Sequence, residues 1–230
     1  MGKRTLTENS RYKIIRVLAN SKEFEQYRLG KETGLSYRTI LRTLKPLERL
    51  GFIKLVRTEP SEKGGKEKKI YVLTFKGLWI YLCDTKLTAK QLEEIINRFP
   101  DMLLFFRKWH LFVEAGIQDK ALDSFRACLS MSWNKYYDMI KIFTSRKPTE
   151  QQYYEFEEAL LSDQKNFLDT SMLVGILYVP GIKDALSPLY MKDKEITDFI
   201  KSIFELKEKE YAQIEELKRE FLPLLNGENH

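Results

Sequence analysis

The sequence predicts a mainly α-helical protein in two parts: an N-terminal module of helices with a two-stranded hairpin, then an α-helical bundle with a long C-terminal helix. Strand-like alternation of apolar and polar residues occurs around residues 52–57 and 69–73 and is missing after residue 88. Charge divides the chain at the same place, because residues 1–84 hold 19 Lys and Arg against 9 Asp and Glu, whereas residues 85–230 hold 20 against 24. We therefore expect one domain over residues 1–84 and a second over residues 85–230.

Composition and motifs argue against several classes of protein. No apolar run reaches the ~18 residues that a membrane helix needs, and the basic N-terminus lacks the apolar segment of a signal peptide. Cys83 and Cys128 have no metal-binding or redox spacing, and His110 is the only internal histidine, so a metal site or a His-based triad lacks parts. No glycine-rich phosphate loop precedes a helix. We expect a cytoplasmic protein that is not an enzyme and uses no metal or cofactor.

The first three predicted helices have the spacing of a helix-turn-helix. Ser10 caps an amphipathic helix that ends at Asn20, and a second short helix runs from about Glu25 to Thr33. The segment Gly34–Ser36 then provides a tight turn, because glycine accepts the positive φ at a helix end and serine is a good N-cap. The third helix follows over Tyr37–Leu50.

The outer face of this third helix is cationic throughout. One side of the helix is apolar, and the opposite side carries cations at steps of four, three and four residues: Arg38, Arg42, Lys45 and Arg49. An ordinary solvated face mixes charges, since like charges at this spacing repel. The unmixed row therefore favours an anionic partner. Pro46 lies off the apolar side, so we expect a bend there rather than a break.

A lysine-rich hairpin is predicted directly after the third helix. Its strands cover about Phe52–Arg57 and Lys69–Leu73, and the polar loop Glu59–Lys68 joins them. Lysines of this loop suit contacts with phosphates or an adjacent minor groove, although a soluble loop with no partner is the alternative. A closing helix capped by Thr74 follows over about 75–83.

Two segments carry a resemblance to a known family: Gly34-Leu35-Ser36-Tyr37-Arg38-Thr39-Ile40 and Leu44-Lys45-Pro46-Leu47-Glu48-Arg49-Leu50-Gly51-Phe52-Ile53. The hairpin and Tyr71-Val72-Leu73-Thr74-Phe75-Lys76-Gly77 extend it. This third of the chain resembles the winged helix-turn-helix of archaeal and bacterial transcriptional regulators of the MarR and ArsR type. The resemblance implies that the recognition helix, about Tyr37–Leu50, enters the major groove of double-stranded DNA while the wing, about Glu59–Lys68, lies on the backbone or minor groove.

The candidate DNA-binding residues come from the turn, the third helix and the loop. Arg38 and Arg42 are expected at guanine edges, with Tyr37 and Thr39 as further base readers. The full set is Ser36, Tyr37, Arg38, Thr39, Arg42, Lys45, Arg49, Lys63, Lys66 and Lys68. The function expected is a DNA-binding transcriptional regulator; the alternative is a winged-helix adaptor in a replication, partition or transcription complex with weak non-specific DNA binding.

The second domain is predicted to be helical throughout. Thr88-Ala89-Lys90-Gln91 is a capping box that begins a helix ending before Pro100. Further helices are expected over about 102–115, with Asp101 as its N-cap, and over about 119–143, 149–160, 166–179 and 193–222. The many aromatic residues of this region suit either a pocket for a small apolar effector or a packed core, and the core is favoured.

The last predicted helix has a narrow apolar seam on a charged surface. Ile196, Ile200, Ile203, Leu206, Ile214, Leu217, Phe221 and Leu224 recur at steps of about three and four, while Lys207 and Glu210 interrupt the seam. Such a helix either dimerises or joins the bundle of its own chain. Both alternatives stay open, and a homodimer suits recognition of a palindromic duplex.

Overall fold

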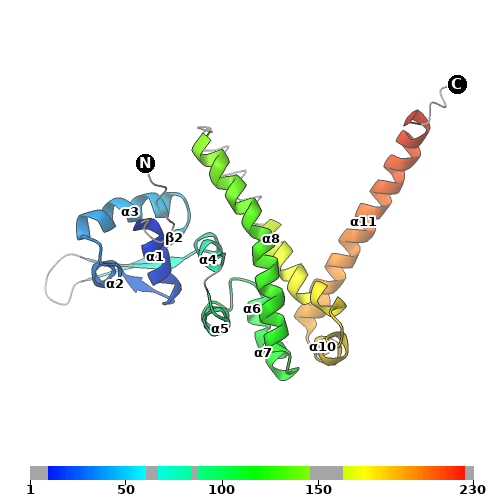
Figure 1. Cartoon of the computed structure of the whole chain (residues 1–230), viewed down its shortest axis with the longest axis horizontal. Coiled ribbons are helices and arrows are strands. Elements are labelled where there is room, and N and C mark those ends of the chain that lie inside the picture. Colours follow the sequence, from blue (N-terminus) through cyan, green and yellow to red (C-terminus); the bar gives the residue numbers. More distant parts are fainter. Residues whose placement is uncertain (1–9, 61–66, 84–86, 146–162, 226–230) are drawn as a thin grey trace.

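A computed structural model describes residues 10–60, 67–83, 87–145 and 163–225 (Figure 1). The described chain is mostly helical with one small antiparallel sheet, and its strands and first helices all lie in the N-terminal third. The distribution of helix and strand along the chain agrees with the coarse prediction from the sequence.

The N-terminal module alternates short helices with strands. Its elements are α1 (Ser10–Ala19), β1 (Phe24–Glu25), the 3-10 turn η2 (Gln26–Arg28), α2 (Leu29–Thr33), α3 (Tyr37–Arg49), β2 (Ile53–Glu59), β3 (Lys68–Leu73) and α4 (Phe75–Leu82). The expected hairpin is present as β2 and β3, paired from Ile53 opposite Leu73 to Glu59 opposite Lys68. The sheet has a third strand that the sequence did not predict, because β1 is only two residues long; it pairs with β3 on the side away from β2.

The apolar faces of α1, α3 and α4 meet in the core of this module. Ile14 and Leu18 of α1, Ile40 of α3 and Trp79 of α4 are completely buried. The apolar side predicted for the third helix is therefore the buried side. Burial of this side forces the opposite row of α3 toward solvent.

The rest of the chain is helical. Its elements are α5 (Ala89–Arg98), α6 (Leu104–Arg107), α7 (Trp109–Glu114), α8 (Gln118–Ser145), a helix over 163–173, the 3-10 turn η3 (Gly175–Tyr178), α10 (Lys183–Tyr190) and α11 (Lys194–Leu225). The capping box at Thr88 is confirmed, since its hydroxyl accepts from the Gln91 amide while the Gln91 side chain accepts from the Thr88 amide. The helix predicted over about 149–160 lies outside the described residues.

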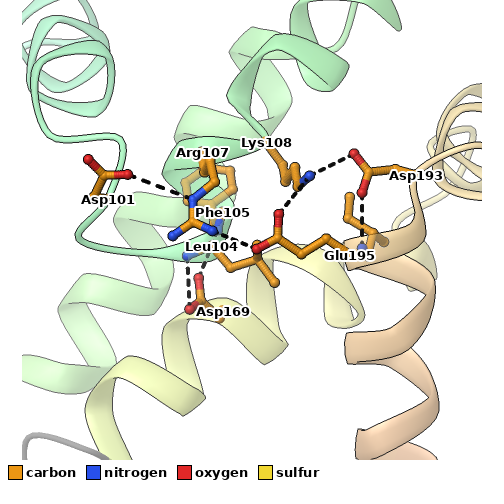
Figure 2. A network of polar contacts seen from close by, with 9 residues as sticks. Asp101, Leu104, Phe105, Arg107, Lys108, Asp169, Asp193 and Glu195 are labelled. Carbon is orange, nitrogen blue, oxygen red and sulfur yellow. Dashed lines mark hydrogen bonds and ion pairs between the residues drawn. The ribbon is translucent and has the colours of Figure 1, made fainter.

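The prediction of one helix over residues 102–115 is wrong. The chain forms two short helices there, α6 and α7, and the expected cap Asp101 is an exposed turn residue. Instead the carboxylate of Asp169, on the helix over 163–173, accepts from the backbone amides of Leu104 at 3.1 Å and Phe105 at 2.8 Å (Figure 2). The first turn of α6 is thus capped by a residue that lies far away in sequence, and no local pattern contains that information.

Aromatic residues fill the core of the second half. Phe105 contacts Trp109 and Phe112 edge to face at 5.7 and 5.2 Å, and Phe125 closes the cluster from α8. These rings pack on one another, as the core interpretation of the sequence expects. A small apolar effector stays a prediction.

Ion pairs fix the start of α11 on the junction of α6 and α7 (Figure 2). The Lys108 ammonium lies 2.8 Å from Asp193 and 2.9 Å from Glu195, and Arg107 contacts Glu195 at 2.6 Å. Asp193 also caps the helix by accepting from the Ile196 amide at 3.1 Å. Burial lowers the pKa of Lys108, but hydrogen bonds to the two carboxylates outweigh it and leave the pKa raised. From this anchor α11 projects away from the rest of the chain (Figure 1).

Candidate nucleic-acid interface

The cationic row of α3 is exposed as predicted. Arg38, Arg42, Lys45 and Arg49 all lie on the solvent side of the helix. Within the described residues, no ion pair engages Arg38, Arg42 or Lys45. Arg57 of β2 differs, because its guanidinium lies 2.6 Å from Glu23 and 2.7 Å from Glu59. Arg38, Arg42 and Lys45 therefore present a concentration of positive charge on the solvent side of α3, which suits a polyanion.

Ser36 and Thr39 hold the start of α3. The Ser36 side chain accepts from the Thr39 amide at 3.2 Å, and the two hydroxyls are 2.9 Å apart. Gly34 has a φ of 68°, which ends α2 and turns the chain toward this cap. Both hydroxyls are thus engaged in positioning the helix. To contact a base, the Ser36 or Thr39 hydroxyl must therefore break or share one of these hydrogen bonds.

Tyr37 is held rigidly in an exposed position. Its ring stacks on Tyr27 with centroids 5.6 Å apart and planes 4° from parallel, and its hydroxyl accepts from the side-chain Nε2 of Gln26 at 3.1 Å. Both rings are about two-fifths exposed, at 40% for Tyr37 and 39% for Tyr27. Sequence reasoning missed Tyr27, because the partner of Tyr37 lies on the preceding turn η2 and only the tertiary fold brings the two together.

The other end of α3 is fixed by the segment 74–77 at the start of α4. Thr74 donates from its hydroxyl to the Gly51 carbonyl at 2.6 Å, and Lys76 donates from its ammonium to the Leu50 carbonyl. These carbonyls follow the last turn of the helix, where backbone acceptors have no intrahelical partner. The helix also continues through Pro46, since the Leu50 amide still donates to the Pro46 carbonyl at 2.9 Å. Both ends of the cationic row are therefore rigidly placed.

The Lys76 side chain is buried in this contact. Its side chain is only 4% exposed, and the ammonium lies 4.2 Å from the centre of the Phe52 ring. Burial lowers the pKa of Lys76 from 10.5 to about 7. The hydrogen bond to Leu50 and the ring face favour the charged form, so they oppose the desolvation without cancelling it.

This pKa predicts a pH dependence of stability. Between pH 7 and pH 10.5 the unfolded chain holds a proton on Lys76 that the folded chain has lost, so stability rises as the pH rises through that window. The free energy of unfolding, measured by chemical denaturation, should rise between pH 6 and pH 9 in the wild type. That rise should be about 2–3 kcal/mol larger than the corresponding rise in Lys76→Met. Equal increases in the two proteins would contradict the shifted pKa.

Of the three hairpin lysines predicted to contact DNA, the structure describes only Lys68. Lys68 is half-buried at the first position of β3, opposite Glu59 of β2, so it belongs to the paired strands rather than to the loop. Lys63 and Lys66 lie outside the described residues. A register shift between Leu55 and Arg57 gives β2 a bulge partway along the hairpin.

The described part of the chain holds neither a metal-binding cluster nor an activated thiol. No group of three or more His, Cys, Asp or Glu side chains is arranged there to hold a metal ion. Cys83 is buried, and burial raises the pKa of its thiol to about 12, far from that of a reactive thiolate. Nor does any described helix combine the length and apolar character of a membrane span.

Comparison of the chain with protein-family models, curated proteins and solved structures found no match. A functional proposal for this chain therefore rests on its own residues and their geometry.

Proposed function

We propose that this protein is a double-stranded DNA-binding transcriptional regulator in which α3 is the recognition helix. The observation that carries the proposal is the exposed cationic row of α3, fixed at one end by the Ser36 cap and at the other by Thr74 and Lys76. The order of elements supports it, because helix, short strand, two helices and a hairpin in succession is the arrangement expected of a winged helix-turn-helix.

The spacing of the arginines suits a groove. Arg38 and Arg42 are one turn apart, about 6 Å along the helix axis, so they address neighbouring base pairs when the N-terminal half of α3 enters the major groove. A guanidinium donates two hydrogen bonds to the O6 and N7 atoms of guanine. Lys45 and Arg49 follow on the same row toward the other end of the helix, where they meet phosphates. The stacked Tyr37 gives this row a stiff, apolar border beside Arg38.

The experiment is selection of duplexes from a random pool, followed by affinity measurements on the selected site. Arg38→Ala and Arg42→Ala should each weaken binding by about 1–3 kcal/mol and relax the preference at particular base pairs. Lys120→Ala is the matched control, since it removes one exposed cation from α8, away from α3, and should leave both affinity and preference unchanged.

Salt and competitor DNA distinguish regulation from a weaker role. A regulator should prefer its selected site over random duplex by at least ~1000-fold at physiological salt. A ratio near one would support the adaptor instead, because non-specific binding depends on phosphate contacts alone. Unchanged affinity in both arginine variants at low salt would contradict α3 as the DNA-binding surface.

A further inference from the structure

The C-terminal helix α11 has two differently packed parts. Ile196 is completely buried, and Phe199 and Ile200 pack against the core, so the first two turns belong to the body of the protein. Beyond Ile203 large apolar side chains are open to solvent, with exposures of 53% at Phe204, 52% at Leu206, 68% at Tyr211 and 46% at Ile214. Figure 1 shows no other described element alongside this half of the helix. The fold therefore leaves a long amphipathic face without an intrachain partner.

The exposed half continues a regular heptad. Ile196, Ile200, Ile203, Lys207, Glu210 and Ile214 follow one another at alternating steps of four and three, the spacing of the core positions of a coiled coil. Phe204 and Tyr211 directly follow two of these core positions, so they border the seam on one side. A coiled coil with another helix of the same kind would bury the seam and these bordering rings together.

The two charged core positions decide the orientation of such a pair. In a parallel pair of identical helices, Lys207 faces Lys207 and Glu210 faces Glu210 of the second copy, which places like charges together in the seam. In an antiparallel pair, the register that sets Lys207 opposite Glu210 also sets Ile203 opposite Ile214, so charge and apolar surface match at the same time. Within one chain Lys207 already contacts Glu210 at 2.5 Å. In the antiparallel pair, each Glu210 carboxylate can therefore contact two Lys207 ammonium groups, one from its own chain and one from the other.

We propose that the protein forms a homodimer through antiparallel pairing of α11, with Lys207 of each copy opposite Glu210 of the other. The occupant of the exposed face is a second copy of this chain, because the helix is complementary to itself in charge and in apolar pattern in this one orientation. Polar residues in a coiled-coil core reduce stability but specify orientation, which is the role of this lysine and glutamate pair. The proposal does not depend on DNA binding.

Sedimentation of the full chain, without DNA, tests the pairing. The wild type should be a dimer at micromolar concentration, and Ile214→Glu should weaken dimerisation at least about tenfold because it places a carboxylate in the seam. Ala212→Glu is the matched control: it adds the same charge two residues away on the outer face of the helix and should leave the dimer intact. A wild type that is monomeric at all concentrations, or equal weakening by both variants, would overturn the proposal.

Disulfide trapping tests the orientation. A mixture of Ile203→Cys chains and Ile214→Cys chains should form a mixed disulfide on mild oxidation, since these positions are opposite each other. Neither variant alone should crosslink. In the antiparallel pair, residue 203 of one copy lies about 16 Å along the seam from residue 203 of the other copy, and the same separation holds for residue 214. Cys83 and Cys128 are buried, so the unmodified chain provides the baseline. Crosslinking of Ile203→Cys with itself would overturn the antiparallel arrangement.

Discussion

Replacing Gly77 by alanine should destabilise the N-terminal module by about 3 kcal/mol, near the upper end for overpacking. A β-carbon at this position would lie 2.3 Å from the carbonyl oxygen of Phe52 and 2.7 Å from a methyl of Leu73. The carbonyl belongs to the backbone immediately before β2 and cannot rotate away, so α4 itself must move. That movement separates Thr74 and Lys76 from the end of α3, and we expect DNA affinity to fall with stability.

Gly30→Ala provides the matched control within the same module. A β-carbon on Gly30 would meet the Leu35 carbonyl at 3.5 Å and Ile40 at 3.6 Å, which are ordinary contacts. Since alanine also favours the helix, the variant should be as stable as the wild type or more stable by up to about 1 kcal/mol. Urea denaturation followed by circular dichroism measures both variants. Equal midpoints for Gly77→Ala and the wild type would show that the close approach of α4 to the Phe52 carbonyl does not exclude a side chain at position 77.

Features set by neighbouring residues could be predicted from the sequence. The positive φ at Gly34, the Ser36 cap and the buried side of α3 all depend on residues within a few positions of one another. The same holds for the capping box at Thr88. For the candidate interface, this local information sufficed to place the cationic row, since the buried apolar side determines where the opposite side points.

Features that depend on distant partners could not be predicted. Two such contacts join separate elements: the stacking of Tyr27 on Tyr37, and the hydrogen bond from Lys76 to the Leu50 carbonyl. The spacing of residues along the sequence does not indicate either of them. β1 was missed because two residues show no periodicity, and its pairing is specified by β3. In the second half, the start of α6 is fixed by a cap that the distant Asp169 supplies.

That cap gives the second large effect. Asp169→Ala should destabilise the protein by about 2–3 kcal/mol, because the amides of Leu104 and Phe105 lose a charged acceptor in a buried site. Burial raises the pKa of Asp169, and the hydrogen bonds from these amides lower it without cancelling that rise. Desolvation of the carboxylate thus offsets much of the gain from the two charge-assisted hydrogen bonds, and the expected loss comes mainly from leaving the two amides without an acceptor.

Asp101→Ala distinguishes the cap that the sequence predicts from the cap that the fold provides. Asp101 begins the same region and also carries a carboxylate, but its side chain is 90% exposed and its contact with Arg107 is 3.9 Å long. Such a surface pair contributes little, so this variant should stay within about 0.5 kcal/mol of the wild type in urea denaturation. If Asp101→Ala cost as much as Asp169→Ala, capping of α6 would be local after all. If only Asp169→Ala is destabilising, the helix over 163–173 determines where α6 begins, and through the adjoining Lys108 contacts it helps to fix the direction of α11.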